Sequence, residues 1–212
     1  MKMPPLIEKP AILALALLPL LAPASSRADA NYDLANSVKY TNLSGNAGHF
    51  CDIEEARQAL DNGADPNAYF MSIGGMQITV LLMAAAYSAS PGCLELIQMV
   101  LEHGANANAI DGKGFTALMY AAQYNSSDLA ALLIAHGADV NAADNEGATP
   151  LSFAVDHNSS NVAKELINAG ANINVTGKQG NTLLMRAIFY NYPNMVAELL
   201  ESGADVNAAD NM

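Results

Sequence analysis

The sequence predicts an all-α solenoid of about five helix–loop–helix units, joined by short β-hairpin turns. The first observation is a repeated phrase, Gly-Ala-(Asp/Asn)-x-Asn, whose five copies end at Asn67, Asn108, Asn141, Asn174 and Asn207. The second is its period, because successive copies are separated by 41, 33, 33 and 33 residues. Such a period indicates one supersecondary unit that buries its apolar face against copies of itself. The third is composition: 51% apolar and 14% charged residues exclude a disordered chain.

Residues 1–30 are predicted to be a secretory signal peptide. Lys2 and Lys9 lie in a short polar start, and residues 11–21 form an apolar run. A small-residue site, Ala28-Asp29-Ala30, follows, which is the usual order of a cleavable leader. The apolar run is too short to span a bilayer comfortably. We therefore expect cleavage after Ala30, no membrane insertion afterwards, and a periplasmic or secreted protein.

The first unit, residues 31–66, is predicted to be an irregular N-terminal cap. We expect its first helix near residues 32–40 and a Gly/Asn-rich loop over residues 42–48. Its second helix is expected over residues 52–60, where apolar residues recur at helical spacing.

The second unit, residues 67–107, is eight residues longer than the units that follow it. Asn67 to Thr79 spans twelve residues where the later units span eight, which places four extra residues in the hairpin. Thr79 to Gly104 spans 25 where the others span 21, which places four more near residues 88–92, between the helices. Such insertions fall in loops and commonly mark a working face.

Three regular units follow, and the last of them must close the stack. They cover residues 108–140, 141–173 and 174–206, and residues 207–212 begin a further hairpin. Each unit has a threonine that can cap its first helix, and these are Thr116, Thr149 and Thr182. A leucine two positions later and an alanine three beyond it lie on one helical face. A glycine then ends the second helix of each unit.

These motifs resemble the ankyrin repeat. The resemblance rests on Thr149-Pro150-Leu151 and on the phrase at residues 137–142, and it extends over about residues 31–212. It implies an L-shaped β-hairpin projecting from each antiparallel helix pair, with partners bound at the hairpin tips and on the concave face. One departure is Gly177, which stands where the other regular units have Asp111 and Asp144.

The two cysteines, Cys51 and Cys93, are predicted to start the second helices of adjacent units. An even pair of cysteines in an exported protein favours a disulfide. Stacked helices lie about 8–10 Å apart, whereas bridged Cα atoms need about 4.4–6.8 Å. The inserted loop before Cys93 can close that gap, so we predict a Cys51–Cys93 disulfide, with two free thiols as the alternative.

The predicted partner-binding surface has two parts. An aromatic-rich line stands eight residues after each helix-starting threonine, at Tyr87, Tyr124, His157 and Tyr190. Aromatic side chains are favoured at interaction hot spots. The predicted hairpin contributors are Ile110, Lys113, Phe115, Glu146 and Lys178, with Tyr69, Phe70 and Met71 in the elongated hairpin of the second unit. The alternative for the elongated hairpin is that its apolar side chains fold back over Ile78 and Leu81.

The sequence favours a non-catalytic protein–protein interaction module. No nucleophile, base and orienting group can be named together, so we expect no enzyme, no cofactor and no metal. The weaker alternative is a metal-binding protein or enzyme that uses His49 and Cys51. The net charge of −12 disfavours nucleic acid and anionic membrane and favours a partner with a basic surface. We expect a monomer, and two roles stay open: a periplasmic scaffold, or an inhibitor or immunity protein that blocks a toxic or lytic enzyme.

Overall fold

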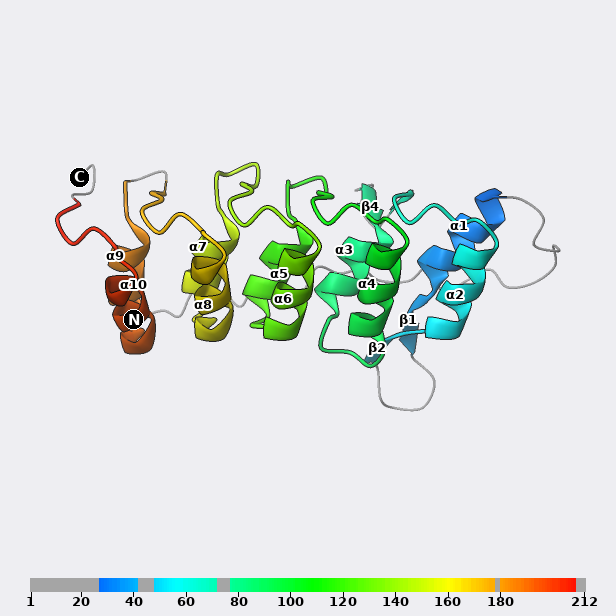
Figure 1. Cartoon of the computed structure of the whole chain (residues 1–212), viewed down its shortest axis with the longest axis horizontal. Coiled ribbons are helices and arrows are strands. Elements are labelled where there is room, and N and C mark those ends of the chain that lie inside the picture. The colour runs from blue at the N-terminus through cyan, green and yellow to red at the C-terminus, as the bar shows by residue number, and fades with distance from the viewer. Residues whose placement is uncertain (1–26, 42–47, 72–76, 178–179, 209–212) are drawn as a thin grey trace.

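The structure, a computed structural model, describes residues 27–41, 48–71, 77–177 and 180–208. These residues form ten helices and four short strands, arranged as a single row of helix pairs (Figure 1). The helices of the regular units are α5 (Ala117–Gln123), α6 (Ser127–Ala135), α7 (Pro150–Asp156), α8 (Ser160–Asn168), α9 (Leu183–Phe189) and α10 (Pro193–Glu201). The all-α repeat solenoid predicted from the sequence is confirmed.

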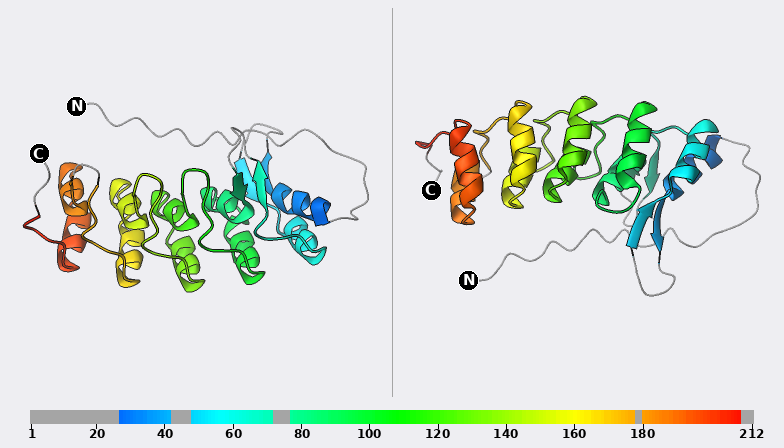
Figure 2. Two further views of the ribbon diagram at one scale, coloured as in Figure 1. Left: turned by 90° about the horizontal axis from the view of Figure 1, so that it is seen from above. Right: turned by 60° about the horizontal axis from the view of Figure 1, so that its bottom comes forward.

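The helices stand in two rows, which are seen end-on from above in Figure 2. The first helix of each unit lies in an inner row and the second in an outer row. Leu118 and Ala121 of α5 and Leu151 and Ala154 of α7 are fully buried between neighbouring units. The small alanines let adjacent inner helices approach closely, so the core is one continuous layer running through the stack.

Threonine caps start the inner helices at the predicted places. Thr116 Oγ1 accepts a hydrogen bond from the Met119 amide at 3.3 Å. Thr149 forms a reciprocal pair with Ser152, in which each side-chain oxygen accepts from the other residue's amide. These bonds satisfy amides that have no partner inside the helix.

The repeated asparagine ties each unit to the next. Asn108 Oδ1 accepts from the Asp139 amide at 2.7 Å, and its Nδ2 donates to the Gly137 carbonyl at 3.1 Å. Asn141 makes the same two bonds with the amide of Asn172 and the carbonyl of Gly170. The 33-residue period is therefore the spacing of an inter-unit clamp as well as of helices.

The N-terminal part of the described chain contains strands as well as helices. It consists of α1 (Arg27–Asn36), β1 (Val38–Thr41), β2 (Gly48–Cys51) and α2 (Ile53–Asp61). The expected helix near residues 32–40 was therefore wrong in its second half, because β1 pairs there with β2 in antiparallel register. The loop predicted over residues 42–48 lies outside the described residues except for Gly48, which begins β2. Ala30, the predicted cleavage site, lies within α1 and is only 2% exposed.

The extra residues of the second unit lie in a longer hairpin and a longer interhelical loop. Its elements are β3 (Tyr69–Met71), β4 (Gln77–Thr79), α3 (Val80–Ala86) and α4 (Cys93–Glu102). Residues 87–92 join α3 to α4, where only residues 124–126 join α5 to α6. In the described part of the chain, no helix has the length and apolar character needed to cross a membrane.

Candidate partner-binding surface

The solvent side of the inner helices α3, α5, α7 and α9 forms one surface, here called the inner face. Three positions of each helix lie on this side, at four, seven and eight residues after the capping threonine, because these positions share one side of a helix. Two of the residues at these positions, Ala86 and Tyr120, are buried beneath the surface, at 9% and 7% exposed. The eighth positions are the predicted aromatic line. The fourth positions are Met83, Tyr120, Phe153 and Arg186, and the seventh are Ala86, Gln123, Asp156 and Phe189. Sequence reasoning missed these two sets, although helical periodicity from the eighth position would have found them.

The aromatic residues of units three and four form a continuous strip. The Phe115 ring lies 4.8 Å from the Phe153 ring in edge contact and 5.7 Å from the Tyr120 ring, measured between centroids. Tyr120 stacks on Tyr124 at 6.5 Å, and Phe153 stacks on His157 at 6.2 Å. We call these five residues the aromatic strip. It brings together three predicted residues and two that were not predicted, Tyr120 and Phe153.

The tyrosines at the start of this surface keep their protons. Burial and then the nearby Tyr124 phenol raise the pKa of Tyr87, and burial raises the pKa of Tyr124. The pKa of Tyr120 is also raised, first by burial and then by the charge of Asp111 and the hydrogen bond to it. The Tyr120 hydroxyl donates to Asp111 Oδ2 at 3.2 Å. All three phenols are therefore neutral hydroxyl groups at physiological pH.

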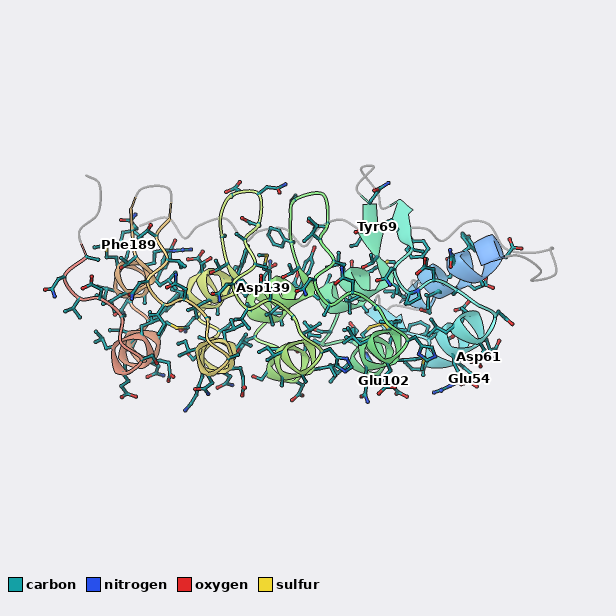
Figure 3. All side chains as sticks on the ribbon, turned by 45° about the horizontal axis from the view of Figure 1, so that its top comes forward. Glu54, Asp61, Tyr69, Glu102, Asp139 and Phe189 are labelled. Carbon is teal, nitrogen blue, oxygen red and sulfur yellow. A yellow bond between two sulfur atoms is a disulfide. The ribbon has the colours of Figure 1, made fainter. Side chains whose placement is uncertain are left out.

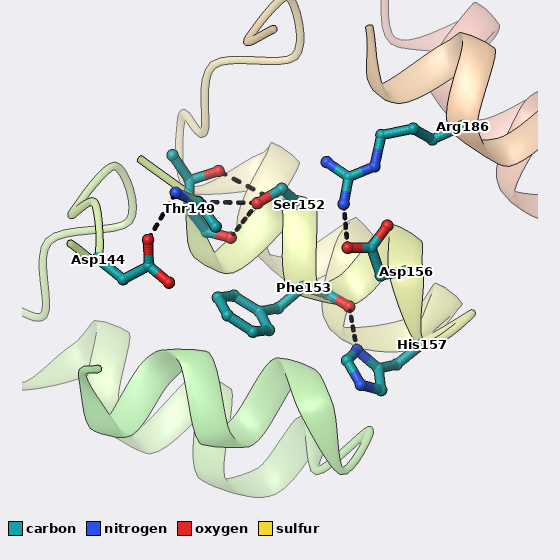
Figure 4. A network of polar contacts seen from close by, with 8 residues as sticks. Asp144, Thr149, Ser152, Phe153, Asp156, His157 and Arg186 are labelled. Carbon is teal, nitrogen blue, oxygen red and sulfur yellow. Dashed lines mark hydrogen bonds and ion pairs between the residues drawn. The ribbon is translucent and has the colours of Figure 1, made fainter. Parts of the chain in front are cut away.

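An ion pair crosses the inner face between units four and five (Figure 4). The Arg186 guanidinium of α9 donates to Asp156 Oδ2 at the end of α7, and both side chains are partly buried. Burial raises the pKa of Asp156, while Arg186 and then His157 partly oppose the shift. The other carboxylate oxygen, Oδ1, is buried and has no hydrogen-bond partner among the described residues. His157 Nδ1 lies 2.9 Å from the Phe153 carbonyl oxygen, which fixes the ring beside the pair.

The hairpins of units three and four are bonded into a rim beside the inner face. Asp111 Oδ1 accepts from the amides of Lys113 and Phe115, and Asp144 makes the equivalent turn in the next unit. The Asn145 amide donates to the Lys113 carbonyl at 3.0 Å. Gly114, with φ of +81°, allows this approach, because a Cβ there would lie 2.8 Å from Asn145 Oδ1.

The predicted hairpin residues differ in exposure. Ile110 is 49% exposed, Lys113 and Glu146 are exposed, and Phe115 is half-buried in the aromatic strip. Lys178 lies outside the described residues. These positions bring apolar and charged side chains of both signs to the rim, so the rim has no single polarity.

In the elongated hairpin, one predicted residue is exposed, as partner binding requires, and the next is folded back on the core. Tyr69 is 53% exposed and projects from β3 (Figure 3). Phe70, the next residue, is half-buried and packs against the core, as the fold-back alternative expects. The side chain of Met71 lies outside the described residues.

The last unit adds the most exposed aromatic group of the described surface. Phe189, labelled in Figure 3, is 81% exposed. Tyr190 is 40% exposed, and the centroids of the two rings lie 5.3 Å apart. Tyr190 was predicted as a contributor, whereas Phe189 was not. Together they extend the aromatic character of the inner face beyond the Asp156–Arg186 pair.

Negative charge is concentrated on the outer helices. Asp156 and Arg186 are the single acidic and the single basic residue of α3, α5, α7 and α9. The outer helices α2, α4, α6, α8 and α10 instead carry nine carboxylates and two cations. The carboxylates are those of Glu54, Glu55, Asp61, Glu95, Glu102, Asp128, Glu165, Glu198 and Glu201. The net charge of the whole chain, −12, is therefore no guide to the charge of the inner face.

The disulfide predicted between Cys51 and Cys93 is present. The two Cα atoms are 4.8 Å apart, and both residues are buried. Cys93 starts α4 as expected, but Cys51 ends β2 instead of starting a helix. The Cys51 amide donates to the Pro91 carbonyl at 2.9 Å. Gly92, with φ of +78°, permits this contact, because a Cβ there would lie 2.3 Å from the Cys51 carbonyl oxygen.

The disulfide also bears on the metal-binding alternative. A bridged Cys51 has no thiolate to offer a metal, and thiolate is the form that coordinates. The side chain of His49 lies outside the described residues. Among the described residues, no group of three histidine, cysteine, aspartate or glutamate side chains could hold a metal ion.

The fold and this surface define a helical repeat protein with an aromatic inner face. The family model for ankyrin repeats, in three copies, matches residues 47–144, 81–177 and 143–210. The chain therefore belongs to the ankyrin repeat family. Ankyrin repeats are general protein–protein interaction modules, and proteins built from them are typically non-catalytic. No curated protein matches the chain.

Proposed function

We propose that this protein is exported and binds a protein partner through its inner face and hairpin tips, without catalysis. The observation that carries the proposal is the aromatic strip, together with the exposed Phe189 and Tyr190 of the next unit. Interfaces are enriched in aromatic residues at their centres. The buried disulfide supports export, since such bonds persist in oxidising compartments.

The partner and the biological role form the finer part of the proposal. A scaffold and an inhibitor or immunity protein would use the same surface, because both need a rigid face and neither needs chemistry of its own. A partner with a basic region would meet the carboxylates of the outer helices, while its contact with the inner face would be apolar.

Position-specific crosslinking in the producing cells tests the binding face. A photoreactive benzoylphenylalanine replaces Phe189 or Ile110 on the proposed surface, and Lys164 on α8 serves as the exposed control. We expect both surface positions to crosslink to one and the same protein and Lys164 to give no such product. Crosslinks to that protein from Lys164 alone would place the interface on the outer helices and contradict the proposal.

Cell fractionation and the N-terminal sequence of the recovered protein test export. We expect a processed chain in the periplasm or medium, and an unprocessed cytoplasmic chain would contradict export. Because Ala30 is buried in α1, cleavage there has to precede the folding of α1, and it removes the first four residues of that helix. Cleavage before Arg27 would leave α1 whole. The N-terminal sequence of the recovered protein therefore also shows whether the mature protein keeps the complete α1 helix.

A further inference from the structure

The ion pair on the inner face influences which kind of peptide segment that face can bind. We propose that the Asp156–Arg186 pair sets the inner face to zero net charge, so that the face selects an uncharged, apolar, extended peptide segment of its partner. The inference rests on the proposed function, because it assumes that the inner face is the binding surface. It adds the chemistry of the ligand and names the two residues that determine it.

The pair neutralises a face that has no other charge on its helices. Asp156 and Arg186 come from different units and bond to each other across the α7–α9 boundary. Asp111 of the rim contacts the aromatic strip, and it accepts two backbone amides and the Tyr120 hydroxyl. What the inner helices offer a ligand is therefore aromatic rings, neutral hydroxyl groups and one compensated ion pair.

The stability of the fold does not explain this pair. Both side chains are partly buried, at 23% and 32% exposed, and Asp156 Oδ1 itself is buried without a partner in the described part of the chain. Removing a carboxylate from water is costly, and a buried ion pair is often no more stabilising than apolar residues of the same volume. The equivalent positions in the two preceding units hold uncharged residues, Ala86 and Gln123 at the seventh place and Tyr120 and Phe153 at the fourth. A role in ligand selection accounts for a pair that packing does not require.

The surroundings of the pair fit an extended apolar segment. Phe153 and the rest of the aromatic strip lie on one side, and Phe189, 81% exposed, lies on the other. An extended chain advances about 3.3 Å per residue, so side chains on one of its sides can meet successive rings along the stack. A basic segment would gain more from the outer helices, where the nine carboxylates lie, and an acidic segment would be repelled there.

Selection from a random library of phage-displayed twelve-residue peptides tests the proposal with the full, oxidised chain. Four proteins are compared: the wild type, Asp156→Asn, Arg186→Gln, and the double variant Asp156→Asn/Arg186→Gln. We expect the wild type to select peptides of near-zero net charge that are rich in apolar and aromatic residues. Asp156→Asn, which leaves the arginine uncompensated, should select acidic peptides, and Arg186→Gln should select basic ones. The double variant restores neutrality and should select uncharged peptides again.

Affinity measurements with one selected peptide then locate the site. Fluorescence anisotropy should show the Kd of Phe189→Ser weakened by about tenfold, the effect of truncating one aromatic anchor. Glu102→Gln on the outer helix α4 should leave the Kd unchanged. Thermal melts confirm that each variant is folded.

Three results would overturn the inference. The wild type could select basic peptides, the single variants could select the same charges as the wild type, or no peptide could be enriched at all. None of these results would by itself contradict the proposed function. Crosslinking at Phe189 and Ile110 tests that function separately, because it also detects a folded partner that binds without an extended peptide segment. Failure of both experiments would remove the inner face as a binding surface.

Discussion

Units four and five of the stack have nearly the same pattern of apolar residues but different environments. Val155 of unit four is fully buried, whereas Ile188, its equivalent in unit five, is 59% exposed. The difference arises because unit five covers Val155, while no described residue covers Ile188 in the same way. In a solenoid, burial is a property of the neighbouring unit as much as of the residue itself.

The contacts between units also differ along the stack, both in hydrogen bonds and in covalent bonds. Asn141 clamps the following unit through two hydrogen bonds, but Asn207 makes no such inter-unit bond among the described residues. At the N-terminal end, units one and two depart from the repeat and are joined covalently by Cys51–Cys93. The middle of the stack thus depends on repeated weak contacts, and its first two units add a covalent tie.

Removal of the disulfide is the change with the largest expected effect. The bond closes a loop with a sequence separation of 42, so the Cys51→Ala/Cys93→Ala variant should lose about 4 kcal/mol of unfolding free energy. Urea unfolding measures the loss. Hydrogen exchange should speed up first in α1 to α4 and least in α7 to α10. Equal acceleration along the whole stack would contradict the view that the two regions differ in what holds them.

Loss of one asparagine clamp is the next largest. Asn141→Ala removes two inter-unit hydrogen bonds and should cost about 1–3 kcal/mol, because each bond contributes about 0.5–1.5 kcal/mol. Asn207→Ala is the matched control and should change the unfolding free energy by less than about 0.5 kcal/mol, as a surface substitution does. Equal losses in the two variants would show that the repeated asparagine acts within its own loop and not between units.

The repeat architecture could be predicted from the sequence because it depends on the spacing of residues that are close together in the chain. Thr116, for example, is found by its distance from Asn108, and its capping bond depends only on the next three residues. The disulfide could be predicted because both cysteines occupy departures from the period. The strand β1 was not predicted, because its pairing with β2 crosses a loop and its alternation of apolar and polar residues extends over only four positions, too few to separate a strand from the end of a helix.

The candidate site was predictable only in part, for a similar reason. Tyr124 was found because it repeats at a fixed distance from the threonine. Tyr120 and Phe153 lie on the same side of their helices, but they vary between units and so gave no repeat signal. The Asp156–Arg186 pair joins residues 30 positions apart, at different places in their units, and only the structure brings them together.

Restoring the missing turn aspartate should stabilise the last unit. Asp111 and Asp144 each accept two backbone amides in their hairpins, and Gly177 cannot. Among the described residues, a Cβ at Gly177 would meet only the Asn181 carbonyl oxygen, at 3.8 Å, which leaves room for a side chain. Gly177→Asp should therefore add about 0.5–1 kcal/mol, partly by restricting the unfolded chain. Gly177→Ala separates the two contributions, since it restricts the chain without supplying the acceptor, and it should give the smaller gain.

The smallest expected effect concerns the pH dependence at the junction of units four and five. Burial raises the pKa of Asp156, so the folded protein holds that proton more tightly than the unfolded chain does. The contribution of this group to stability is then lost as pH rises through the window above its ordinary pKa of about 3.9. Asp156→Asn lacks the carboxylate, while Arg186 and His157 remain in both proteins. Relative to the wild type, the melting temperature of Asp156→Asn should therefore increase between pH 4 and pH 7. A relative decrease over that range would mean that attraction to Arg186 outweighs burial, and that the pair stabilises the junction after all.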